Sequence, residues 1–226
     1  MSGVTIPLRV IAGAATAAEL AAARDRFLAG RRVRVQTACA ARSASTAMER
    51  LAARREAVGR CAPPRLRAAA DAALARAVSA PTRVATRDAL AAVEALEQAE
   101  ERAALARAEQ ELVLARLVNA LPEGMVPGTQ ARRTADGTLS VRTSYAGGQV
   151  DINLAADGRA LALDMAASGV HELQTSAGAL VGCEAELALS RRMAETWRRA
   201  GIDVAVAEPE APAGRAAHAA GRGAGR

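Results

Sequence analysis

Few residues of this chain are of types that could do chemistry. His171 and Cys183 are the one internal histidine and a nearby cysteine, a pair able to supply a base and a nucleophile. Cys183, however, falls on the apolar face of a helix expected over about 183–200, and a free buried cysteine behaves as a small hydrophobic residue. We therefore assign no catalytic residue.

Two aspartates, Asp151 and Asp164, form a second candidate. The expected strand register places them opposite each other on the polar face of a sheet, where like charges repel. A metal ion or a shared proton could relieve that repulsion, so a metal-dependent enzyme stays as a distant alternative. Arg142, expected diagonally across from Asp151, offers a structural answer, and we favour relief by this arginine or by solvent. We predict neither a metal nor a cofactor.

The basic residues form a third candidate, because they are unevenly distributed. Residues 24–87 hold 15 arginines and 4 acidic residues, whereas residues 88–121 hold 3 arginines and 7 acidic residues. A cluster within the first segment could bind phosphate backbones or an acidic partner. Alternatively, it pairs with the acidic helix that follows, or it is only solvated. The candidate residues are Arg31, Arg32, Arg34, Arg54, Arg55, Arg60, Arg65 and Arg67.

Composition limits the possible functions. The chain has 226 residues and a net charge of +6, with 62 alanines, one Phe, one Tyr, one Trp and no lysine. RNA readers that stack bases on several aromatic rings are therefore excluded. The odd set of 3 cysteines lacks CxxC and Cys/His ligand spacing, so a disulfide framework or a zinc site is not expected. Such a cysteine set makes a reducing cytoplasm the expected location. No run of about 18 apolar residues is present, so we expect no membrane partner.

The N-terminal half is predicted to be mainly helical. Residues 1–37 indicate a β-α-β element: an edge strand containing Pro7, a helix from Thr16 to about Ala29 ended by Gly30, and a short strand at Val33 and Val35. Residues 38–121 indicate a helical region that ends in a long helix over 86–121. The middle of that helix is polar on all sides, so we expect an antiparallel helical hairpin with two packed ends.

A linker over 122–128 precedes a small sheet domain over 129–207, and residues 208–226 read as a disordered tail. Asp136-Gly137, Gly147-Gly148 and Asp157-Gly158 are hairpin-turn signals. A turn at Gly147-Gly148 pairs Tyr145 with Val150, and a turn at Asp157-Gly158 pairs Leu154 with Leu161. Both assignments place one continuous apolar set on one face, which the helix over about 183–200 would cover with Cys183, Leu187, Met193, Ala194 and Trp197.

The sequence thus predicts an α+β fold: an Ala/Arg-rich helical N-terminal part with a long helical hairpin, then a small antiparallel β-meander covered by one C-terminal helix. We expect a non-catalytic adaptor or scaffold protein that binds a protein partner or a second copy of itself through helical packing and a basic surface. The alternative is sequence-nonspecific binding to nucleic-acid backbones through residues 24–87.

Overall fold

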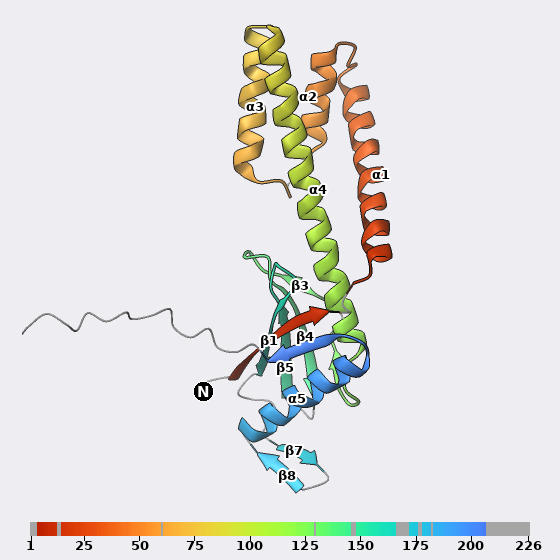
Figure 1. The fold of residues 1–226 in the computed structure, drawn as a ribbon, viewed down its shortest axis with the longest axis vertical. Coiled ribbons are helices and arrows are strands. Elements are labelled where there is room, and N and C mark those ends of the chain that lie inside the picture. Colours follow the sequence, from red (N-terminus) through yellow and green to blue (C-terminus); the bar gives the residue numbers. More distant parts are fainter. Residues whose placement is uncertain are drawn as a thin grey trace, which may run out of the picture.

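The computed structural model describes residues 4–12, 15–59, 61–128, 130–145, 148–165, 172–175, 178–181 and 183–206. Within them the fold is α+β, as predicted: a helical arm extends from a sheet domain, and one long helix runs through both (Figure 1). We use "helical arm" for the first three helices together with the fourth helix as far as Glu109. The expected tail at 208–226 lies outside the described residues.

Local sequence signals account for most helix starts in the arm. Thr16 and Thr46 each accept the backbone N–H of the glutamate three residues later, and that glutamate bonds back to the threonine N–H. Pro64 occupies the first turn of its helix, where its missing N–H costs nothing. The four helices are α1 (Ala17–Ala41), α2 (Ala47–Ala57), α3 (Pro64–Ser79) and α4 (Arg83–Asn119).

The expected end of the first helix at Gly30 and the strand at Val33 and Val35 are wrong. Helix α1 continues through all three residues, so no β-α-β element forms. A single glycine inside a helix costs only about 1 kcal/mol, and tertiary contacts override such a penalty. Here the contacts are ion pairs from α1 to α4, among them Arg34 to Glu100 at 3.3 Å.

Helix α4 connects the two halves of the molecule. It begins three residues before the predicted Thr86, because Thr82 caps it by accepting the N–H of Ala85. Its 37 residues span about 55 Å. In the arm it packs antiparallel to α1 and α3, which confirms the predicted hairpin arrangement (Figure 1). The core there is small and mostly alanine: Leu51, Val58, Ala62, Ala70, Ala73, Ala77, Ala89, Val93 and Leu96.

The main sheet is antiparallel, in the order β2-β4-β5-β6-β1-β9, with β3 also paired to β4. A separate hairpin joins β7 to β8. The strands are β1 (Val4–Ala12), β2 (Val126–Pro127), β3 (Arg132–Arg133), β4 (Leu139–Tyr145), β5 (Gly148–Leu154), β6 (Ala160–Met165), β7 (Glu172–Thr175), β8 (Gly178–Val181) and β9 (Asp203–Val206). The predicted linker therefore contains a strand, β2.

The predicted register is right for one hairpin and shifted for the other. Leu154 pairs with Leu161 as expected, and Gly158 supports that turn with a φ of +68°. Tyr145, in contrast, pairs with Gly148, so the β4–β5 register moves by two residues. Because side chains alternate with a period of two, this shift keeps every apolar residue on its predicted face.

Strand β1 was expected at an edge because of Pro7, and this is wrong. It lies between β6 and β9. The N–H of Val10 points to the β6 side, where it bonds the carbonyl of Arg159. Since N–H directions alternate along a strand, Pro7 lacks its donor on the β9 side. Strand β9 ends at Val206, opposite Leu8, so within the described residues the proline interrupts no ladder hydrogen bond.

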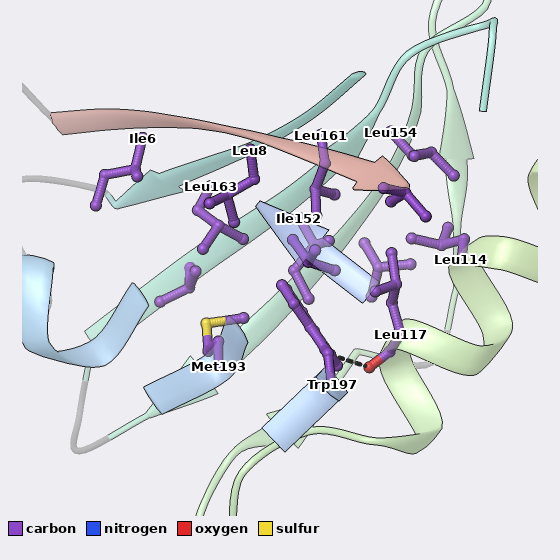
Figure 2. Packing of buried hydrophobic residues seen from close by; sticks show 14 of the residues in the cluster. Ile6, Leu8, Leu114, Leu117, Ile152, Leu154, Leu161, Leu163, Met193 and Trp197 are labelled. Carbon is purple, nitrogen blue, oxygen red and sulfur yellow. Dashed lines mark hydrogen bonds between the residues drawn. The ribbon is translucent and has the colours of Figure 1, made fainter. Parts of the chain in front are cut away.

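Two helices share the task of covering the apolar face of the sheet. Helix α5 (Cys183–Arg199) contributes Leu189, Met193 and Trp197, while Leu187, expected in this core, is 46% exposed. The last turns of α4 contribute Leu114 and Leu117, which the sequence prediction had not placed there. Figure 2 shows the joint between them: the indole Nε1 of Trp197 donates to the Leu117 carbonyl at 2.8 Å.

A buried glutamine fixes α4 to the sheet domain. Gln110 is only 1% exposed, and its Nε2 donates to the carbonyls of Gly137, Leu154 and Ala155 at 2.9 to 3.0 Å. Its Oε1 accepts a hydrogen bond from the Arg133 guanidinium. The accepting carbonyls belong to two different hairpin turns, so a single side chain sets the position of α4 against both.

Candidate interaction surface

The structure does not gather the eight candidate arginines on one surface. Arg31, Arg32 and Arg34 lie on α1, Arg54 and Arg55 on α2, and Arg65 and Arg67 on α3; Arg60 lies outside the described residues. Helices α1 and α3 lie on opposite sides of α4 in Figure 1. The basic segment therefore surrounds the acidic part of α4.

Three of these arginines pair with acidic residues of α4, as one of the sequence interpretations required. Arg34 reaches Glu100 at 3.3 Å, Arg54 reaches Glu97 at 2.7 Å, and Arg31 lies 4.0 Å from Glu101. The Arg54–Glu97 contact has two hydrogen bonds, and these, followed by the Coulombic attraction of Glu97, raise the pKa of Arg54. Arg55 pairs instead with Asp71 of α3 at 2.7 Å. Half of the candidate set thus holds the arm together.

A buried carboxylate lies at the centre of this ion-pair network. Glu100 is only 2% exposed, and its Oε1 accepts the backbone N–H of Gly59 at 2.6 Å as well as the Arg34 guanidinium. A Cβ at position 59 would lie 2.7 Å from that oxygen, which explains why glycine suits this position. Sequence reasoning missed this role, because the 97–102 stretch was read only as polar on all sides. The signal was a strongly acidic helix centre beside a strongly basic segment.

Three candidate arginines have no ion pair among the described residues. Arg32 and Arg65 are exposed, and Arg67 is half-buried. Arg32 lines a hollow of about 320 Å³ between α1 and α2, together with Arg31, Val35, Gln36, Arg54 and Glu97. This hollow is where the structure brings candidate residues together, and its cationic rim suits a carboxylate or phosphate group.

Helix α1 is the least buried long element of the arm. Of its 25 residues only Ala23 is buried. Charged contacts along its length hold it to α4 instead, from Arg116–Glu19 at 2.7 Å near its start to Arg24–Glu101 at 2.7 Å and Arg34–Glu100 further along. Arg31 and Arg34 also lie within 5.9 Å of the centre of the Phe27 ring. Most of the α1 surface is therefore available to a partner.

A second hollow lies where α1 and α4 run side by side between the tip of the arm and the sheet domain (Figure 1). Its volume is about 430 Å³, and we call it the neck groove. Leucines, alanines and charged side chains line it. Its residues are Leu20, Ala21, Arg24, Arg102, Leu105, Ala106 and Glu109.

The aspartate pair is confirmed as a directly opposed pair, Asp151 against Asp164. Arg142 lies directly across from Asp151, not diagonally, and binds both its oxygens at 2.8 and 3.1 Å. These hydrogen bonds, and then the Coulombic attraction of Asp151, raise the pKa of Arg142. Asp164 accepts from the Thr5 hydroxyl and the Asn153 amide, both at 2.6 Å. Neighbouring donors therefore already relieve the repulsion.

The other candidate chemistry cannot be placed. His171 and the side chain of Cys183 lie outside what the structure describes. Among the described residues, no group of three or more His, Cys, Asp or Glu side chains could hold a metal ion. No helix in that part of the chain is both long and apolar enough to cross a membrane.

No protein-family model, curated protein or solved structure matches this chain. Its class therefore follows from its own architecture: an α+β protein in which one helix carries a helical arm away from a sheet domain.

Proposed function

We propose that this is a non-catalytic assembly protein, an adaptor or scaffold, whose helical arm binds a protein partner. The observation that supports this most directly is the exposure of α1, where one residue of 25 is buried. A long helix gains little stability from propensity alone and is usually stabilised by packing of an apolar or charged face. On this proposal the sheet domain is the base and the arm is the binding element.

Charge indicates which kind of partner the arm would bind. Glu97, Glu100 and Glu101 of α4 pair with arginines of α1 and α2. Arg32 has no acidic partner among the described residues. Arg31 and Arg54 line the same hollow, so its outer rim is cationic. An acidic protein segment would complement it, with guanidinium–carboxylate pairs as the principal contacts.

Light scattering after gel filtration tests the proposal, with the protein alone and with duplex DNA, at low and at high salt. A stable oligomer of the protein alone would support an assembly role, whereas a complex with the DNA would favour the second candidate described below. A monomer at every concentration and salt that is also indifferent to DNA would argue against it.

Binding to nucleic-acid backbones is the second candidate, favoured by the exposed arginines without ion pairs. Arg32 and Arg65 are exposed and available for phosphate contacts, and such binding weakens steeply with salt. Arg32→Glu should weaken DNA binding at low salt, whereas Arg132→Glu, at an exposed position of the sheet domain, should have little effect. DNA binding that does not change between low and high salt would contradict this candidate.

We propose a cytoplasmic location for the protein. Cys39 and Cys61 are free thiols in the structure, which suits a reducing compartment. Quantifying free thiols in protein isolated under alkylating conditions would test this, and a disulfide-linked form as the main species would contradict it.

A further inference from the structure

The neck groove has an unusual arrangement of residues on its α4 side. Arg102, Leu105, Ala106 and Glu109 are spaced i, i+3, i+4 and i+7, so they form one stripe along the helix. Ala106, Arg102 and Glu109 are exposed, and Leu105 is half-buried. The stripe continues toward the arm tip through the exposed residues Gln98, Ala95 and Ala91, so no other helix of the arm covers it.

The two charges of the stripe are not used within the described part of the chain. The Nε of Arg102 makes only a long, 3.4 Å hydrogen bond to the Gln98 carbonyl. Glu109 has neither a hydrogen bond nor an ion pair among the described residues. Three glutamates of the central part of α4 differ in this respect, because Glu97, Glu100 and Glu101 all pair with arginines of the arm.

Two copies of this stripe are complementary to each other when they run antiparallel. A two-fold axis passing between Leu105 and Ala106 places Leu105 of one copy against Ala106 of the other, large against small. The same axis places Arg102 opposite Glu109 of the second copy, and Glu109 opposite Arg102. A parallel alignment would instead place arginine against arginine and glutamate against glutamate. Charge complementarity therefore favours the antiparallel alignment alone.

We infer that the neck groove binds a second copy of this chain, so that two α4 helices pack antiparallel about an axis near Leu105. In each copy, Leu20 and Ala21 of α1 add to the apolar lining of the groove. The contact would place the α1–α4 pair of one copy against the α1–α4 pair of the other, as a four-helix arrangement. Arg102–Glu109 ion pairs would lie at its two ends. This inference rests on the proposed assembly function, and it makes a second copy of the chain one of the partners.

Charge reversal in solution tests the pairing. Arg102→Glu sets glutamate against Glu109 of the partner, and Glu109→Arg sets arginine against Arg102, so each variant alone should weaken dimerisation by about tenfold or more. Mixing the two variants restores both opposite-charge contacts, because each chain then supplies the sign that the other lacks. The double variant carrying Arg102→Glu and Glu109→Arg should dimerise as the natural chain does.

The measurement is sedimentation velocity of the full chain across micromolar concentrations at low salt. Arg26→Glu is the control matched to Arg102→Glu, because Arg26 is exposed on the opposite side of α1 from the groove and the two substitutions change the net charge equally. Unchanged far-UV circular dichroism and thermal melting would show that each variant is folded. The expected result is dimer loss in each single reversal, recovery in the mixture and in the double variant, and no change in the control.

Different failures point to different conclusions. A dimer that both single reversals leave intact would overturn the groove interface while the assembly function stands. A mixture that stays monomeric, although the natural chain dimerises, would overturn the antiparallel register and the proposal with it. A natural chain that is monomeric but binds an acidic protein would remove only the dimer, whereas a monomer that binds only DNA would favour the second candidate function over both. A monomer that binds neither would contradict both proposals.

Discussion

The side-chain Nε2 of Gln110 lies 2.9 Å from the backbone carbonyl oxygen of Leu154, at the point where α4 enters the sheet domain. Leu154 ends β5, and the same amide nitrogen also reaches Ala155 beside it and Gly137 in another turn. The direction in which the arm leaves the sheet is therefore set by a polar contact, in addition to the apolar packing of Leu114 and Leu117 further along α4.

Gln110→Ala should destabilise the junction. The change removes the buried amide that donates to three backbone carbonyls, of which Gly137 keeps the Arg133 guanidinium and Ala155 keeps the N–H of Gly158 as donors. We expect a loss of about 1–3 kcal/mol in the free energy of unfolding. Chemical denaturation followed by far-UV circular dichroism measures it. Gln98→Ala, on an exposed part of the same helix, should change stability by less than about 0.5 kcal/mol. Equal effects of the two substitutions would contradict the junction role.

Gly30→Ala should stabilise the protein. Gly30 lies inside α1 with helical neighbours on both sides, and an added Cβ would meet only the Arg34 guanidinium, at an ordinary 3.7 Å. Replacing glycine by alanine in a helix interior gains about 0.5–1 kcal/mol. The midpoint of denaturant unfolding reports the change. A loss of stability would mean that Gly30 ends the helix with a positive φ, as sequence reasoning alone suggests.

The arm and the sheet domain should unfold in separable steps. Five of the nine buried residues in the arm core are alanine, against one of twenty-one in the sheet core, so the arm buries less apolar surface for each core residue. Trp197 is the only tryptophan and lies in the sheet core, so its fluorescence follows that core alone. Far-UV circular dichroism, dominated by the helices, should therefore show a transition at lower temperature than the fluorescence.

A matched pair of substitutions checks that assignment. Leu96→Ala in the arm core and Leu163→Ala in the sheet core both empty fully buried sites, and each should cost about 2–5 kcal/mol. Leu96→Ala should lower mainly the circular-dichroism transition, and Leu163→Ala mainly the fluorescence transition. If both probes shift together in both variants, the molecule unfolds as one cooperative unit.

The N-terminal cap of α1 should stabilise the helix less in acid. The Thr16 backbone N–H and then the Thr16 hydroxyl bond the Glu19 carboxylate, with help from Arg116, and lower its pKa from 4.5 to about 2. Because the folded pKa is below the unfolded one, the carboxylate stabilises the helix above about pH 4.5, and this contribution is lost as the pH falls toward 2.

Carboxyl NMR titration measures that pKa directly. With Glu19→Gln, the loss of helicity in acid should no longer include the contribution from the Thr16 cap of α1. With Glu49→Gln, it should no longer include the contribution from the Thr46 cap of α2. A Glu19 titration midpoint near 4.5 would show that the carboxylate is not held by Thr16 and Arg116.

The sequence by itself determined what depends on neighbours along the chain. The capping boxes at Thr16 and Thr46 start helices where hydroxyl and carboxylate spacing requires it. The alternation of apolar residues predicted which faces of β4, β5 and β6 are buried, and that assignment survived even the two-residue register shift at Tyr145. Such features depend only on local hydrogen bonds and on the two-residue alternation of side chains along a strand. They can therefore be predicted from the sequence without the tertiary structure.

Only the tertiary structure decided what depends on segments far apart in sequence. Helix α1 continues through Gly30 because α4 supplies the opposing charges, and β1 is internal because β9, nearly 200 residues later, pairs with it. The same holds for the candidate site. Composition revealed a basic segment and an acidic helix. The packing of α1 against α4 decides which arginines form ion pairs, and it leaves Arg102 and Glu109 without one among the described residues. Short-range propensity differences of about 1 kcal/mol are too small to fix such choices against long-range ion pairs and burial.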